Sequence, residues 1–302
     1  MNLDDEEESS NIIDRRGEGG GGFGGGGLPF GIGGGGMSLG TLVVVVVLGL
    51  IFGVNPLQLL GGAGGGGVGG SDVGQPQVEQ SQVAGPAAAL DGEHDRFINN
   101  VLVNTERTWG QLFPEQVGKP YPEPKLTLFA GQIRSGCGPA DSGMGPFYCP
   151  ADQSVYLDSS FFDDLSRRFG APGDFAAAYV IAHEVGHHIQ TVLGVSDQVQ
   201  QARRTSSEAQ GNALSVRQEL QADCLAGVWA HHNKALLEAG DIEEGLRAAE
   251  AIGDDRLPQQ AGGRVSPESF THGTSAQRMR WLQRGLTSGQ MASCDTFAAR
   301  SL

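Results

Sequence analysis

The chain has 302 residues, of which 35 are acidic and 20 are basic, so its formal net charge is −15 at pH 7. Such an excess of negative charge disfavours binding to nucleic acids and to anionic lipid headgroups. We therefore expect no nucleic-acid partner.

The beginning of the chain differs in composition from the rest. Residues 17–70 contain 25 of the 49 glycines and, apart from Glu18, no charged side chain. Residues 1–36, acidic and then glycine-rich, have too little apolar surface to fold, and we predict a disordered tail. In the range 37–60, a run of apolar residues and glycine with uncharged flanks reaches the roughly 20 residues that cross a bilayer. This range is predicted to be a transmembrane helix.

The predicted span has the features of an uncleaved signal anchor, because the stretch before it is acidic and no small-residue cleavage site follows it. Arg15 and Arg16 precede the span, and the next basic residue is Arg96. Since basic residues gather on the cytoplasmic side, we expect the N-terminus in the cytoplasm. The prediction is a single-pass protein of the cell membrane with an extracytoplasmic folded domain.

A linker rich in glycine, serine, glutamine and proline is predicted over 61–89, followed by one folded domain over 90–302, which is long enough for one core. Periodicity predicts helices over 93–112, 159–169, 174–193 and 212–238, and strands over 125–130 and 154–157. A last helix begins at Thr274 or Ser275. The predicted fold class is α+β, mostly helical with a small sheet, preceded by the single transmembrane helix.

Four cysteines lie in the predicted domain, and none belongs to a C-x-x-C pair; they are Cys137, Cys149, Cys224 and Cys294. In a non-cytosolic domain this pattern favours two disulfides over a second metal site. Four reduced, buried thiols are the alternative. Of the three possible pairings, we favour the local loop between Cys137 and Cys149 together with Cys224 to Cys294.

The most informative motif is H-E-x-x-H at residues 183–187, within the apolar helix predicted over 174–193. His183 and His187 lie one turn apart on one face, so both imidazoles can reach one zinc ion, and Glu184 can act on a water beside it. Burying these groups without a partner or a metal would cost several kcal/mol. A zinc site is therefore favoured over satisfied core histidines or a chance match.

The next predicted helix, 212–238, offers a third ligand, which a catalytic zinc needs beside an open fourth position. Glu219 and Asp223 lie one turn apart on one face, and we assign Glu219 to the metal. Asp223 is expected to accept a hydrogen bond from the distal nitrogen of His183 and so to fix its orientation. The alternative for these two carboxylates is an exposed acidic helix face.

The sequence H-E-V-G-H-H followed by E-L-Q-A-D resembles the gluzincin metallopeptidases, and the last two thirds of the chain resemble the membrane-anchored bacterial neutral zinc metallopeptidases. Segments at 135–138, 145–152, 155–158 and 271–274, with Arg278, extend the match in the same order. The resemblance implies a zincin-like domain in which His272 stabilises the oxyanion. Gly273 is a departure, because related peptidases often carry proline there.

These residues predict a zinc-dependent metallopeptidase that hydrolyses peptide bonds in peptides or unfolded proteins. Zinc on the three ligands would activate a water, and Glu184 would pass its proton to the leaving amine. One alternative is a catalytically silent, zinc-stabilised interaction module on the membrane surface, which would not need Glu184. Another is a membrane-anchored scaffold whose motif is accidental. Nothing in the sequence indicates the oligomeric state.

Overall fold

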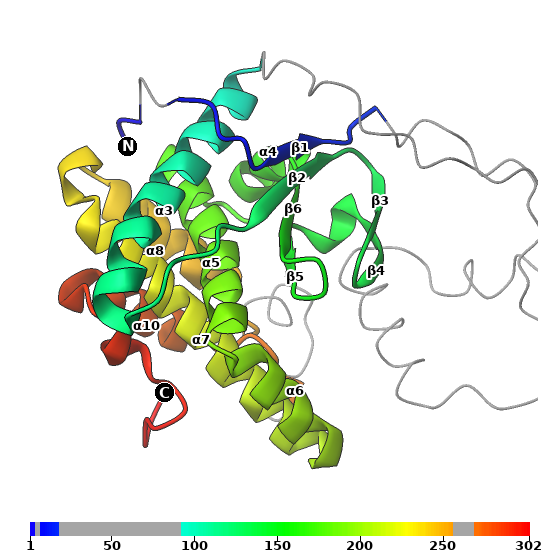
Figure 1. Cartoon of the computed structure of the whole chain (residues 1–302), viewed down its shortest axis with the longest axis vertical. Coiled ribbons are helices and arrows are strands. Elements are labelled where there is room, and N and C mark those ends of the chain that lie inside the picture. Colours follow the sequence, from blue (N-terminus) through cyan, green and yellow to red (C-terminus); the bar gives the residue numbers. More distant parts are fainter. Residues whose placement is uncertain (4–6, 18–91, 256–268) are drawn as a thin grey trace, which may run out of the picture. The chain divides into compact units, whose positions relative to one another are not determined.

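The computed structural model describes residues 1–3, 7–17, 92–255 and 269–302 (Figure 1). These residues lie in a compact unit formed by residues 1–21 and 88–302. The predicted linker over 61–89 lies outside the described residues.

Among the described residues, a four-stranded sheet has the order β1-β2-β6-β5. Its strands are β1 (Ile12–Asp14), β2 (Lys125–Phe129), β6 (Ser154–Asp158) and β5 (Phe147–Cys149). The first three run parallel, whereas β5 is antiparallel to β6. A separate antiparallel hairpin consists of β3 (Gln132–Ser135) and β4 (Gly138–Asp141). Strands β2 and β6 match the two strands predicted from the sequence.

Helices make up most of the described unit. They are α3 (Glu93–Val117), α4 (Ser160–Arg167), α5 (Asp174–Val192), α6 (Val195–Thr205), α7 (Glu208–His232), α8 (Asp241–Ala251) and α10 (Ser275–Ser288). Three 3-10 turns cover Ser142–Met144, Lys234–Leu236 and Met291–Cys294. Figure 1 shows α3, α5, α7, α8 and α10 gathered beside the sheet. The α+β, mostly helical class is therefore confirmed.

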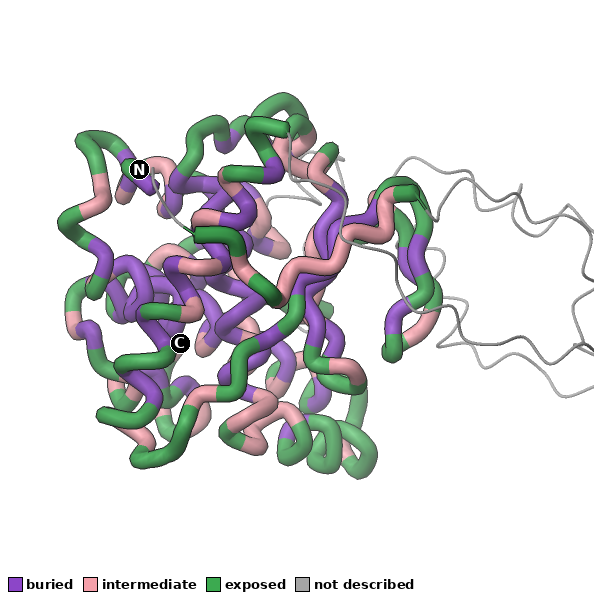
Figure 2. The backbone as a smooth tube through the Cα atoms, turned by 45° about the horizontal axis from the view of Figure 1, so that its top comes forward, coloured by how far each residue is buried: buried purple, intermediate pink, exposed green. Residues whose placement is uncertain are grey.

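Helix α5 lies at the centre of the core. Its apolar residues Phe175, Ala178, Val185 and Ile189 are at most 3% exposed, and Figure 2 shows buried stretches through the middle of the helical layer. Almost every residue from 175 to 190 is buried, so the H-E-x-x-H motif lies inside the protein. Polar side chains in such a place need partners of their own.

Helices α7 and α10 cross at very short range. A Cβ atom on Gly285 of α10 would overlap the carbonyl oxygen of Cys224, and one on Gly227 of α7 would overlap the carbonyl oxygen of Leu282. The two glycines therefore let the backbones approach each other directly. A disulfide from Cys224 to Cys294 joins α7 to the turn that follows α10.

The N-terminal residues are part of the fold, whereas residues 1–36 are predicted from the sequence to be a disordered tail. Strand β1 pairs with β2, with Ile12 opposite Leu126, and the side chains of Met1 and Leu3 join the hydrophobic core. The range as a whole is poor in apolar residues. Among its described residues, Met1 and Leu3 are buried and Ile12 is partly buried, because the distant domain supplies the core that they join.

The prediction of a single-pass membrane protein is contradicted. No helix in the described part of the chain combines the length and the apolar composition needed to cross a bilayer. The range 37–60, where the span is predicted, lies outside the described residues. The predicted orientation also conflicts with the sheet, because β1 and β2 are hydrogen-bonded neighbours and cannot lie on opposite sides of a membrane.

Candidate metal centre

Three donor side chains converge between α5 and α7. His183 and His187 project from α5, and Glu219 projects from α7. The Nε2 atom of His183 lies 3.3 Å from Oε2 of Glu219, and the Nε2 atom of His187 lies 3.5 Å from Oε1 of the same carboxylate. One donor atom from each residue lies within 4.8 Å of the others. The structure therefore brings together the three side chains that the sequence assigns to the metal.

Gly186, inside the motif, sets the separation of the two helices. A Cβ atom at this position would lie 3.0 Å from the carbonyl oxygen of Ala222 and 3.3 Å from its side chain, which is closer than ordinary packing. Ala222 lies one turn after Glu219 on α7. The absence of a side chain at Gly186 thus lets α7 bring that carboxylate within reach of both imidazoles.

Both imidazoles are held through their other nitrogen. The Nδ1 atom of His183 donates to Oδ1 of Asp223 at 2.8 Å, and the Nδ1 atom of His187 donates to Oε1 of Gln190 at 2.8 Å. A donating Nδ1–H leaves the lone pair on Nε2, the atom that faces the carboxylate of Glu219. The partner predicted for His183 is therefore found. Gln190 was missed, and only its position three residues after His187 could have indicated it.

Asp223 lies in a fully buried polar cluster. Arg278 donates to it through Nε at 2.9 Å and Nη2 at 2.8 Å, and the hydroxyl of Tyr179 donates at 2.6 Å. Burial alone would raise the pKa of Asp223, but the positive charge of Arg278 and the hydrogen bonds from His183 and Arg278 lower it below its usual value. An ionised Asp223 is a strong acceptor for the Nδ1–H of His183. The pairing with Arg278 depends on tertiary structure and has no local sequence signal.

Glu184 lies beside the histidines on α5, and only 7% of its surface is exposed. Burial raises the pKa of its carboxyl group, against the charges of His183 and His187, which lower it. A carboxylate with a raised pKa accepts a proton more readily than an ordinary glutamate does.

His272 lies in the loop before α10, and its side chain is 53% exposed. Its Nδ1 atom lies 3.1 Å from Oδ1 of Asp254. Partial desolvation lowers the pKa of His272, but the hydrogen bond to Asp254 and the charge of Glu219 outweigh it and raise the pKa. Reciprocally, the charge of His272 is among those that lower the pKa of Glu219. The charges of His272 and Glu219 therefore influence each other.

Asp254 shapes the loop that carries His272, and no local sequence pattern indicates this role. Its Oδ2 atom accepts backbone N–H bonds from Thr271, His272 and Gly273 at 2.7, 2.6 and 3.1 Å. Gly273 has a φ of 88°, a left-handed conformation that favours glycine. Proline can neither adopt this φ nor donate this hydrogen bond, so it would not fit this loop conformation.

Two disulfides are present, Cys137–Cys149 and Cys224–Cys294. This is the pairing favoured from the sequence. The second disulfide starts at the residue after Asp223, so it holds the part of α7 that contacts His183.

The comparison with protein families identifies the chain. The sequence profile of the family described as "Putative neutral zinc metallopeptidase" matches residues 1–297. The chain belongs to this family. This confirms the resemblance to the neutral zinc metallopeptidases, although the match does not show membrane anchoring. The family description implies zinc at the His/Glu site.

The chain is also similar to bacterial proteins whose names describe them as uncharacterised. The protein YpfJ of Escherichia coli K12 is 56% identical over 209 residues, which cover 68% of this chain and 72% of the relative. The protein Rv2575 of Mycobacterium tuberculosis H37Rv is 44% identical over 226 residues, which cover 69% of this chain and 73% of the relative. No solved structure matches the chain.

Proposed function

We propose that this chain is a zinc-dependent peptidase in which His183, His187 and Glu219 hold the metal and Glu184 is the general base. The observation that carries the proposal is the convergence of two Nε2 atoms and one carboxylate inside the core. Each imidazole donates its Nδ1–H elsewhere, so its lone pair is directed at the shared centre.

The donor set fits zinc in chemistry and in spacing. Ligand atoms bonded to a tetrahedral zinc at about 2.0–2.1 Å lie about 3.3 Å from each other. The two distances between histidine nitrogens and carboxylate oxygens are 3.3 and 3.5 Å. Two histidines and a glutamate are also a known ligand set of catalytic zinc, in which one position stays open for water.

When bound, zinc supplies a water of lowered pKa and polarises the scissile carbonyl. Glu184 takes a proton from the attacking water and delivers it to the leaving amine. His272, oriented by Asp254, donates a hydrogen bond to the oxygen on which negative charge develops. Asp223 and Gln190 keep the two imidazoles in place.

The proposed substrates are peptides or unfolded proteins, handled in a zincin-like arrangement. Strand β5 forms one end of the sheet and lies against α5, because the hydroxyl of Tyr148 is 3.1 Å from Nδ1 of His188. An extended polypeptide can pair with such an edge strand through its main chain. The edge position of β5 beside the motif helix therefore supports an extended substrate.

Zinc content tests the ligand set. We expect the purified protein to hold one zinc per chain. Alanine at His183, His187 or Glu219 should weaken zinc binding more than about a hundredfold, which exceeds the usual effect of losing a residue that only hydrogen-bonds to a ligand. Elemental analysis with chelator competition measures both quantities. Glu208→Ala, on an exposed carboxylate of the same helix, is the control. Full zinc occupancy in Glu219→Ala would remove that residue from the site.

The role of His272 is tested by kinetics. A donor to the developing oxyanion acts in the transition state, so His272→Ala should lower kcat by roughly ten- to a thousandfold, with zinc content unchanged. His94→Ala changes an exposed histidine on α3 and serves as the control. An unchanged kcat in His272→Ala would mean that the oxyanion is stabilised by another group.

A further inference from the structure

The N-terminal arm, defined as residues 7–17, binds the domain as an extended peptide binds a receptor. Strand β1 extends the sheet in parallel with β2. The backbone N–H of Leu126 donates to the carbonyl of Asn11 at 2.9 Å, and the N–H of Arg15 donates to the carbonyl of Leu128 at 2.8 Å. These main-chain bonds are of the kind that gives affinity in β-augmentation.

Side chains of the arm are recognised by polar groups on the helix and the loop beside β2. The amide of Asn11 donates to Glu106 at 2.8 Å and to Glu123 at 2.7 Å. Ser9 donates through its hydroxyl to Glu106 at 2.8 Å and through its backbone N–H to the buried Asn99 at 2.8 Å. Three of these four hydrogen bonds are donated by side chains of the arm, so its binding depends on its sequence.

Arg16 of the arm forms ion pairs with two carboxylates. Its Nη1 atom lies 2.8 and 2.9 Å from the two carboxylate oxygens of Asp95 on α3, and its Nε atom donates to Asp14 at 3.0 Å. The side chain of Asp95 is only 7% exposed. A buried carboxylate without its partner is costly, so the groove is built to receive a cation at this position.

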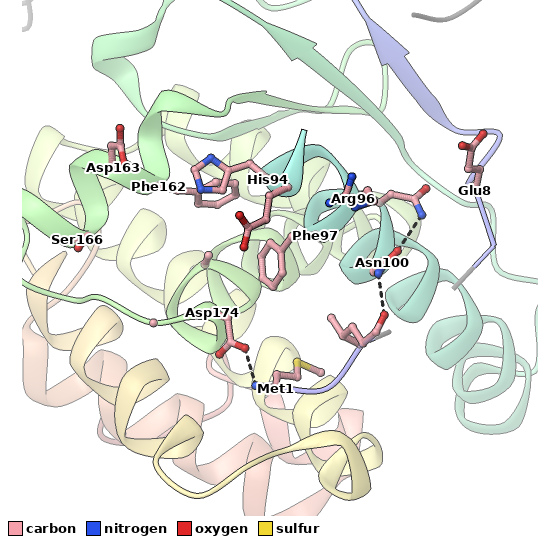
Figure 3. A pocket seen from close by; sticks show the side chains of 15 residues that line it. Met1, Glu8, His94, Arg96, Phe97, Asn100, Phe162, Asp163, Ser166 and Asp174 are labelled. Atoms are coloured by element: carbon pink, nitrogen blue, oxygen red, sulfur yellow. Dashed lines mark hydrogen bonds and ion pairs between the residues drawn. The ribbon is translucent and has the colours of Figure 1, made fainter. Parts of the chain in front are cut away.

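The first residues of the chain add a second anchor beyond the arm. The amide of Asn100 on α3 donates to the carbonyl of Leu3 at 2.7 Å, and the amino group of Met1 lies 2.6 Å from Asp174 at the start of α5. Figure 3 shows both contacts at the wall of a cavity between the N-terminal residues and the helices, also lined by Phe97. Met1 and Leu3 are 7% and 5% exposed.

We propose that α3 and the outer edge of β2 form a peptide-binding groove whose ligand is the N-terminal arm of the same chain. The arm stays bound in this groove even when its covalent link to the domain is cut. The occupant is the arm of the same chain, because a tethered ligand has an effective concentration that a second copy in dilute solution does not reach. The bound arm covers the edge of β2, which would otherwise be open to pairing with other chains. This inference is independent of the proposed peptidase activity.

The test cuts the connection and asks whether the arm stays. A recognition sequence for a site-specific protease is inserted between Gly61 and Gly62 of the full chain. The protein is then cut, and a denaturing gel verifies that cleavage is complete. Gel filtration then separates bound from released fragments. We expect residues 1–61 to co-elute with residues 62–302. Elution of the short fragment alone from the cut wild-type protein would overturn the proposal.

Variants show whether the contacts described here hold the arm. Arg16→Ala and Asn11→Ala each remove hydrogen bonds to carboxylates and should weaken retention at least about tenfold. Ser10→Ala, at an exposed position beside Asn11, should leave it unchanged. Asp95→Asn tests the same contact from the groove side if an arm variant fails to fold. Retention equal to wild type in folded Arg16→Ala and Asp95→Asn would overturn the proposed recognition.

The mass of the uncut protein tests the choice of occupant. Native mass spectrometry at micromolar concentration should give a monomer of 31.5 kDa plus the inserted sequence. A dimer that Arg16→Ala converts to a monomer would show that the groove holds the arm of a second copy, and would overturn the proposal of binding within one chain.

Discussion

Glu184→Gln is expected to lower peptide hydrolysis by several orders of magnitude while zinc content stays at the wild-type level. Glutamine keeps the shape of the side chain in its buried position, but it cannot accept the proton of the attacking water. General base catalysis contributes typically 10²- to 10⁴-fold, so the loss falls on kcat. Steady-state kinetics and elemental analysis of the same preparation measure both quantities.

The matched control for this variant is Glu208→Gln, which makes the same chemical change at an exposed position of α7 and should leave both quantities unchanged. Turnover retained in Glu184→Gln would rule out this residue as the base. A protein that holds zinc fully but shows no hydrolysis even in the wild type would instead match the silent interaction module.

Gly285→Ala is expected to destabilise the fold by roughly 3 kcal/mol or more. The new Cβ atom would overlap backbone atoms of Cys224 and approach the backbone nitrogen of Val228 to 2.8 Å. Backbone at a helix crossing cannot move aside as a flexible side chain can, so α10 and α7 must separate. Separation also strains the pairing of Arg278 with Asp223, and we expect zinc to bind more weakly as well.

Gly110→Ala provides a control in which the sign of the effect is reversed. Gly110 lies on an exposed face of α3 with open space where a Cβ would be placed, so alanine should stabilise the helix by about 0.5–1 kcal/mol. Urea denaturation with the disulfides intact measures the free energy of unfolding of both variants. Equal stability of Gly285→Ala and wild type would mean that α7 and α10 are not packed this closely.

The sequence was sufficient for the parts of the site that one helix determines. The spacing of His183 and His187 places both on one face of α5, and the spacing of Glu219 and Asp223 does the same on α7, so periodicity alone predicts which side chains share a helix face. That the two helices meet was an inference from chemistry, since nothing local indicates that Gly186 packs against Ala222.

Contacts between distant segments could not be predicted. Arg278 reaches Asp223 across 55 residues, and Asp254 anchors the loop of His272 across 18. Neither partner has a spacing that periodicity can detect. The hydrogen bonds become predictable only when the packing of α7, α8 and α10 is known.

The N-terminal region shows how composition can mislead. A range dominated by acidic residues and glycine was predicted to have no structure, but Ile12 and Ile13 belong to strand β1 because β2 is available beside them. Strand propensity depends on what a segment can pack against, and composition averaged over 36 residues does not contain this information. The predicted orientation across a membrane is also wrong, because it places the N-terminal segment and the domain on opposite sides, whereas β1 is hydrogen-bonded to β2.

The most direct measurement of the central claim is the cleavage of an unfolded protein by the purified full chain, first stripped of metal by a chelator and then supplied with one equivalent of zinc. Mass spectrometry maps any new termini in the substrate. The proposed site predicts no cuts without metal, cuts restored by one zinc per chain, and none in Glu184→Gln at equal zinc content. Cuts that persist in the metal-free protein, or no cuts at full zinc occupancy, would contradict it.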